Sequence, residues 1–169
     1  MRALILDVDG VLTDGRLYYT RRGETVKAFF SRDGFAIKMA QSLGLKVGIL
    51  SGRGGAVLRR RLADLSIEPA LVVEESHDKA RDFALLCQRL GMAPTEVAYM
   101  GDDVPDVVVL RQAGLAMAPA DAAPEAQSVA HLITRATGGK GAVREAIVFI
   151  LQARGLWETA LRQWHALAD

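Results

Sequence analysis

The sequence has one cysteine, few aromatic residues, no long apolar run and no excess of either charge. Because Cys87 has no second cysteine to pair with, no intrachain disulfide can form, and we expect a reducing, cytoplasmic environment. The 21 basic and 20 acidic residues give no reason to expect a nucleic-acid or acidic-lipid partner. The apolar run 146–151 is far shorter than the roughly 20 residues of a membrane span. The N-terminal run 3–6 is also shorter than the roughly 7 apolar residues that a signal peptide needs.

Short apolar runs alternate with amphipathic stretches along the chain. With 169 residues, 50% of them hydrophobic, we expect one domain over residues 1–169 with a sizeable core. Runs that are apolar on both faces are typical of parallel strands covered by helices. The expected strands are Ala3–Leu6, Val47–Leu50, Leu71–Val73, Val97–Met100 and Leu115–Ala118, and the expected helices are Phe35–Leu43, Ala56–Leu65, Lys79–Leu90 and Ala142–Leu151. This alternation predicts a doubly wound, mainly parallel, Rossmann-like α/β sheet.

One segment, residues 15–30, interrupts this alternation. It is typical of two strands, Arg16–Thr20 and Thr25–Phe30, joined through Gly23, and so predicts a β-hairpin flap after the first strand. An isolated hairpin is marginal in water, so its aromatic side chains need a cover, either their own domain or another subunit. The same two alternatives apply to the C-terminal tail, residues 155–169, which we expect to be helical.

Acidic residues cluster where two of the expected strands end. Asp7 and Asp9 follow the first strand, and Asp102, Asp103 and Asp106 follow the fourth. The carboxyl ends of strands in an open α/β sheet form its ligand-binding edge, and carboxylates this close need a cation or a shared proton. Oxygen ligands favour Mg²⁺. The structural alternatives are a turn at Asp9 and a helix cap at Asp103, but three acids within residues 102–106 exceed what a cap requires.

Ser51 and Lys79 follow other elements of the same sheet edge. Ser51 ends the second strand, where a hydroxyl and backbone N–H groups can hold a phosphoryl oxygen; an ordinary helix N-cap is the alternative. Lys79 opens a helix, where a cation opposes the helix dipole. A bound phosphate would explain that position, and a solvated surface lysine is the alternative.

These groups of residues, in this order, resemble the signature motifs of the haloacid dehalogenase superfamily of phosphotransferases. Within it, the chain is most similar to the capless branch that hydrolyses 3-deoxy-D-manno-octulosonate 8-phosphate. The similar stretches are 7–15, 27–29, 33–34, 50–53, 98–103 and 138–145. The spacing agrees with a capless enzyme, because no lid domain fits between Asp9 and Ser51 or between Ser51 and Lys79.

The resemblance implies a mechanism for the acidic residues. Asp7 is expected to attack phosphorus and form an aspartyl-phosphate, while Asp9 acts as the acid and base. Mg²⁺ would be held by the Asp7 carboxylate, the Asp9 backbone carbonyl and Asp102. Asp103 or Asp106 would orient the water molecules bound to the metal, or Lys79, without binding the metal directly, and the residues leave open which of the two does so.

The resemblance also implies a substrate site and an assembly. Ser51 and Lys79 are expected to contact the phosphoryl group, and Gly52, Arg53 and Lys79 to bind substrate, a phosphorylated sugar acid. Members of this branch are homotetramers in which neighbouring subunits help to close each active site. The hairpin and the C-terminal tail are therefore expected to make subunit contacts.

The chain departs from that branch at three places. Glu74-Glu75 stands where the branch usually has Gln-Gly, Ala36 where it has a second glycine, and Ser51 where threonine is commoner. The acidic pair leaves open a related nine-carbon sugar-acid phosphate as the substrate. A phospho-acceptor signalling domain is the non-enzymatic alternative, but Asp9 argues against it because an acid and base at that position promotes turnover.

Overall fold

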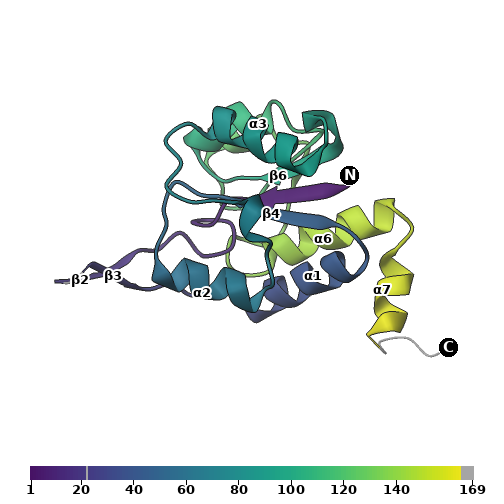
Figure 1. Ribbon diagram of the computed structural model, residues 1–169, viewed down its shortest axis with the longest axis horizontal. Helices are drawn as coiled ribbons and strands as arrows, with labels where there is room; N and C mark the ends of the chain where they lie inside the picture. The colour runs from purple at the N-terminus through teal and green to yellow at the C-terminus, as the bar shows by residue number, and fades with distance from the viewer. Residues whose placement is uncertain (22, 165–169) are drawn as a thin grey trace.

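A six-stranded sheet in the order β5-β4-β1-β6-β7-β8 is the centre of the computed structural model, which describes residues 1–21 and 23–164 (Figure 1). The strands are β1 (Ala3–Leu6), β4 (Lys46–Leu50), β5 (Val72–Val73), β6 (Val97–Met100), β7 (Leu115–Ala118) and β8 (Leu132–Ile133). Every pairing in this sheet is parallel, with Leu4 of β1 opposite Val47 on one side and Ala98 on the other. The expected Rossmann-like α/β sheet is confirmed.

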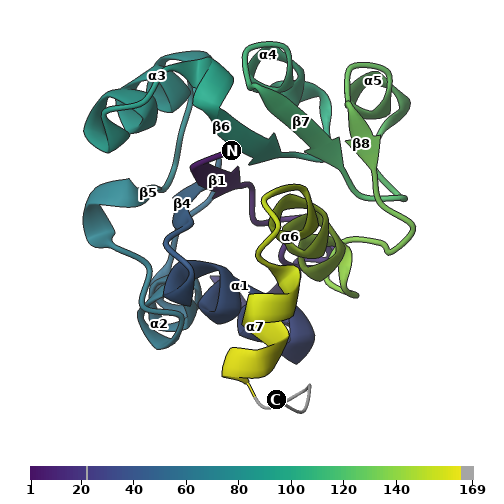
Figure 2. The ribbon, with the colours of Figure 1, turned by 90° about the vertical axis from the view of Figure 1, so that its right-hand side faces the viewer.

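Helices cover both faces of the sheet (Figure 2). One layer contains α1 (Ser31–Ser42), α2 (Ala56–Asp64), α6 (Ala142–Ala153) and α7 (Trp157–Gln163), and the other contains α3 (Lys79–Leu90), α4 (Val107–Leu110) and α5 (Pro124–Gln127). Alternate residues of β1 supply the two cores: Leu4 and Leu6 pack toward α1 and α6, and Ala3 and Ile5 pack toward α3 and α4. This is why the strand is apolar at every position.

The expected hairpin is present, but its two strands have different bounds from those expected. Its strands are β2 (Tyr18–Thr20) and β3 (Gly23–Val26), paired from Thr20 opposite Gly23 to Tyr18 opposite Val26, with a bulge beside Tyr18. The expected extension of the second strand to Phe30 is wrong, because the chain turns inward at Lys27, whose side chain is buried. The hairpin extends away from the body of the protein (Figure 1).

Several other boundaries differ from expectation, two of them for a clear physical reason. Leu71 belongs to a 3-10 turn (Pro69–Leu71) rather than to β5, because its N–H donates to the carbonyl of Glu68. Helix α1 begins at Ser31, four residues early, because Asp33 in its first turn accepts hydrogen bonds from two N–H groups at the start of α6. The short elements α4, α5 and β8 were not expected.

The described part of the C-terminal tail packs on its own chain. Ala160 of α7 is buried, and Trp157 and Leu161 pack against the core. Trp164, which is exposed, meets the ring of Phe35 edge to face, with 4.8 Å between the ring centroids. Residues 165–169 of the expected helix lie outside the described residues.

Candidate active site

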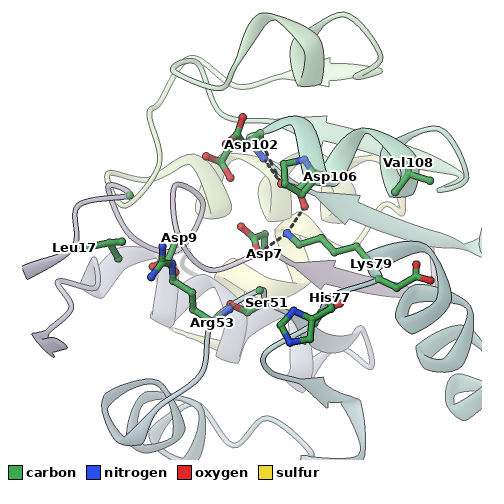
Figure 3. Close-up of a pocket in the computed structure, with 16 residues that line it drawn as sticks. Asp7, Asp9, Leu17, Ser51, Arg53, His77, Lys79, Asp102, Asp106 and Val108 are labelled. Atoms are coloured by element: carbon green, nitrogen blue, oxygen red, sulfur yellow. Dashed lines mark hydrogen bonds and ion pairs between the residues drawn. The ribbon is translucent and has the colours of Figure 1, made fainter. Parts of the chain in front are cut away.

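The sequence-predicted site residues lie together around one cavity at the carboxyl edge of the sheet (Figure 3). The cavity has a volume of about 710 Å³. Its lining includes all nine of these residues: Asp7, Asp9, Ser51, Gly52, Arg53, Lys79, Asp102, Asp103 and Asp106. They come from the loops that follow β1, β4 and β6 and from the first turn of α3, so the parallel topology brings them together.

Lys79 connects two buried carboxylates in the centre of the cavity. Its Nζ atom lies 3.0 Å from Oδ1 of Asp7 and 2.6 Å from Oδ1 of Asp106 (Figure 3). The side chain of Lys79 is 10% exposed, so the alternative of a solvated surface lysine is wrong. Its position at a helix start is explained by these two anions, which outweigh an unfavourable helix dipole.

Asp106, rather than Asp103, holds Lys79 in this arrangement through hydrogen bonds. Its Oδ1 accepts from Lys79 and from the hydroxyl of Tyr99, and its Oδ2 accepts from the N–H groups of Asp102 and Asp103 at 3.1 and 3.2 Å. A carboxylate has about four acceptor sites, so those of Asp106 are all used. The carboxylate of Asp103 instead accepts from the N–H of Val104 at 2.7 Å and caps the short turn that follows.

The buried carboxylates lack enough positive charge to balance them. Burial, followed by the charge of Asp106, raises the pKa of Asp7 to about 7, although Lys79 opposes the shift. Burial and the charges of Asp7, Asp106 and Asp103 raise the pKa of Asp102 to about 8. Burial would lower the pKa of Lys79, but the attraction of Asp7 and Asp106 outweighs it and the pKa is raised.

The donor set fits a hard divalent cation. One carboxylate oxygen from each of Asp7, Asp102 and Asp106 lies within 4.8 Å of the others. Because the oxygens of Asp106 are already engaged, Asp7 and Asp102 are the carboxylates of this cluster that can serve a cation. Burial first, and the charges of neighbouring carboxylates second, raise the pKa values of Asp7 and Asp102, and a bound cation would offset both effects. The Asp9 carboxylate does not belong to this cluster, which is compatible with the expected contribution of its backbone carbonyl.

Glycine at position 10 allows Asp102 to approach the loop after β1. A Cβ atom built at Gly10 would lie 2.0 Å from Oδ2 of Asp102, and the residue has φ +87°. A side chain at this position would displace the carboxylate as well as strain the backbone. The close packing of these two loops is therefore a requirement of the site.

Ser51 is buried and lies on the other side of Asp7 from Asp102 and Asp106 (Figure 3). Its buried hydroxyl accepts a hydrogen bond from the N–H of Arg53 at 3.2 Å, while the N-cap of α2 is Gly55. The alternative of an ordinary serine N-cap is therefore wrong. Arg53 donates from Nη1 to the hydroxyl of Tyr19 at 2.8 Å, which ties the hairpin to the rim.

Three residues of the site were missed by sequence reasoning. Tyr99 lies in a strand of apolar residues, so its hydroxyl contact with Asp106 had no signal of its own. Lys27 is 18 positions from Asp9, to which it is ion-paired, and only the fold of the hairpin brings the two together. His77 lines the cavity close to Lys79 (Figure 3), and the side-chain direction in its loop has no sequence pattern.

Known proteins share this sequence and this fold. A family model described as haloacid dehalogenase-like hydrolase matches residues 66–147. The 3-deoxy-D-manno-octulosonate 8-phosphate phosphatase KdsC of Escherichia coli (strain K12) is 41% identical over 163 residues, which are 96% of this chain and 86% of that protein. The chain belongs to this phosphatase family. It is therefore a member of a family of phosphomonoester hydrolases.

Solved structures of the family have the same architecture. The phosphatase from Moraxella catarrhalis, solved with a magnesium ion, a phosphate ion and a KDO molecule, has a TM-score of 0.92 and 33% identity, covering 97% of this chain and 93% of that one. The cobalt-bound enzyme from Haemophilus influenzae has a TM-score of 0.90 and 39% identity, covering 93% and 91%. Among the described residues, no helix has the length and apolar character needed to span a bilayer.

Proposed function

We propose that the protein is a Mg²⁺-dependent phosphatase that releases phosphate from 3-deoxy-D-manno-octulosonate 8-phosphate through an aspartyl-phosphate at Asp7. The observation that carries this proposal is the position of Asp7, a buried carboxylate that faces the cavity and shares Lys79 with Asp106. The 41% identity to the KdsC phosphatase supports the substrate, and the magnesium, phosphate and KDO bound by the Moraxella catarrhalis enzyme support the cofactor and the product.

The residues after β1 and β6 would hold the cation. Asp7 and Asp102 supply carboxylate oxygens and Asp9 supplies its backbone carbonyl, while Asp106 is fully engaged by other donors and positions Lys79. Bound Mg²⁺ would supply the positive charge that keeps Asp7 and Asp102 ionised and that balances the phosphoryl oxygens.

Asp7 acts as the nucleophile in the first half of the reaction. One of its carboxylate oxygens forms a bond to phosphorus while the bond from phosphorus to the sugar oxygen breaks. Lys79, the Ser51 hydroxyl and nearby backbone N–H groups spread the charge of the transferring group. Lys79 is already in place for this role, because two carboxylates hold its ammonium group.

Asp9 moves the protons in both halves. Its protonated carboxyl gives a proton to the departing sugar oxygen, which leaves as an alcohol. The resulting Asp9 carboxylate then takes a proton from the water that attacks phosphorus. That second step breaks the bond between Asp7 and phosphorus, releases inorganic phosphate and restores both aspartates.

The rim of the cavity is open and carries charge that can select the sugar acid. Arg53 offers a cation to the substrate carboxylate, whereas Glu74 and Glu75 lie against Gly54 next to it. Glu75 has φ +56°, a backbone conformation that suits glycine better. Because these acidic residues depart from the family pattern, a nine-carbon sugar-acid phosphate is the second candidate substrate.

We also propose that the phosphatase works in the cytoplasm as a homotetramer. Tyr18, Tyr19 and Val26 of the hairpin are 47%, 60% and 53% exposed, and a neighbouring subunit would cover them. Such a neighbour would also narrow a cavity over which residues 1–21 and 23–164 form no lid domain. The single cysteine, Cys87, supports the reducing compartment.

Phosphate release is the experiment that tests the proposed function. The purified protein is given each of the two sugar-acid phosphates with Mg²⁺ and, separately, with EDTA. We expect Mg²⁺-dependent release with a higher kcat/KM for the eight-carbon substrate, and no release by Asp7→Asn. A higher kcat/KM for the nine-carbon substrate would reassign the substrate. A stable phosphoryl group on the protein without turnover would instead establish a signalling domain.

A further inference from the structure

Lys27 is a buried lysine at the base of an exposed hairpin. Its side chain is 1% exposed, whereas Tyr19 and Val26 on the hairpin arms are 60% and 53% exposed. Removing an ammonium group from water costs several kcal/mol unless an anion compensates it. A lysine buried to this extent therefore needs an anionic group beside its ammonium group.

Asp9 supplies such an anion. The Nζ atom of Lys27 donates to Oδ1 of Asp9, whose side chain is 20% exposed and lines the cavity. Lys27 is not among the lining residues and is too deeply buried to touch a substrate there. The contact with Asp9 connects Lys27 to the proposed reaction.

We propose that Lys27 is a positioning residue that holds the Asp9 carboxyl group in a fixed orientation beside the cavity. This inference rests on the proposed function, in which Asp9 protonates the departing sugar oxygen. An ammonium group has three donors and no acceptor. The contact therefore engages Oδ1 as an acceptor and fixes the orientation of the carboxyl plane.

The hairpin has a second attachment at the rim. The hydroxyl of Tyr19 accepts from Nη1 of Arg53 at 2.8 Å, so the hairpin contacts the loop after β1 through Lys27 and the loop after β4 through Tyr19. Gly15 and Leu17, at the start of the hairpin segment, line the cavity. The position of the hairpin is thereby linked to the orientation of the acid.

The dependence on the leaving group separates positioning of the acid from a general structural role. A sugar oxygen leaves as a poor anion and needs the proton of Asp9, whereas p-nitrophenolate is stable near neutral pH and needs it little. The values of kcat/KM are compared because they report the steps up to transfer of phosphorus to Asp7. The variant is Lys27→Met, and Lys38→Met, at an exposed position on α1, is the matched control.

We expect Lys27→Met to lower kcat/KM about 30-fold or more for the sugar-acid phosphate but by less than about 3-fold for p-nitrophenyl phosphate, since a general acid contributes about 10² to 10⁴. Lys38→Met should retain the wild-type ratio of the two values. Equal losses on both substrates, or no loss on either, would overturn the proposal. If Lys27→Met does not show a cooperative thermal transition, Lys27→Gln is measured against the same criterion. Failure of the proposed function would be distinct, because the wild-type protein would then hydrolyse neither substrate.

Discussion

Replacing Asp7 by asparagine should abolish turnover and, at high pH, stabilise the protein without metal. The side chain of Asp7 is 8% exposed, and at high pH it is an anion close to Asp102 and Asp106. Lys79 pairs with Asp7 and Asp106. Asparagine has nearly the same shape and carries no charge. It keeps an oxygen that can accept from Lys79, so the packing of the site is retained.

The sign of the effect follows from the raised pKa of Asp7, which burial and then Asp106 shift from 3.8 to about 7. Between these values the folded protein holds a proton that the unfolded chain has released, so the stability of wild type falls as the pH rises and levels off above about pH 7. The interval from pH 5.5 to the folded-state pKa of about 7 is about 1.5 pH units, and over it the free energy of unfolding of wild type falls by roughly 2 kcal/mol. For a chain of this size that is roughly 4–8 °C in Tm.

The assay is thermal unfolding of both proteins in EDTA at pH 5.5 and pH 8.5. We expect the Tm of Asp7→Asn minus that of wild type to increase by several degrees from the lower to the higher pH. Adding Mg²⁺ should raise the Tm of wild type more at pH 8.5 than at pH 5.5, because the cation replaces protons that the site otherwise holds. If the difference in Tm between the two proteins does not change with pH, or becomes smaller from pH 5.5 to pH 8.5, the reasoning about the buried charges is refuted.

Two further substitutions test other parts of the site. Tyr99→Phe removes the buried hydroxyl that donates to Asp106 and should lower the free energy of unfolding by about 1–3 kcal/mol, measured with urea; unchanged stability would contradict that contact. Gly10→Ala places a Cβ atom 2.0 Å from Oδ2 of Asp102 and should remove the increase in Tm on adding Mg²⁺. Gly44→Ala is its control, because Gly44 also has a positive φ, +79°, but nothing within 4 Å of the added atom. If both variants lose the Mg²⁺-dependent increase in Tm equally, the effect is due to backbone strain and not to displacement of Asp102.

The parallel sheet and the position of the site could be predicted from sequence for the same reason. Strands buried on both faces are continuous apolar runs, as in Ala3–Leu6 and Val97–Met100, and each run is followed directly by its acidic residues. Because parallel strands all end at one edge, knowing the strands was enough to place Asp7, Ser51 and Asp102 around one cavity. The two-to-four-residue elements α4, α5 and β8 are too short for any periodicity to be visible.

What could not be predicted depends on tertiary contacts between side chains. The choice between Asp103 and Asp106 needed the direction of each carboxylate, which is set by a single turn. Tyr99 looks like any core residue of a buried strand, although its hydroxyl is part of the polar network. Lys27 looks like an ordinary polar residue of a hairpin, and its burial follows from the inward turn of the chain after Val26.

Identification of the phosphorylated residue tests the central claim most directly. The protein with Mg²⁺ is mixed with the sugar-acid phosphate, quenched in acid during the first turnover and treated with borohydride, which reduces an acyl phosphate on aspartate to homoserine. We predict homoserine at position 7 in the peptide map, and none in a sample that received no substrate. Reduction at another carboxylate, or phosphate release with no modification at position 7 at any quench time, would contradict the account.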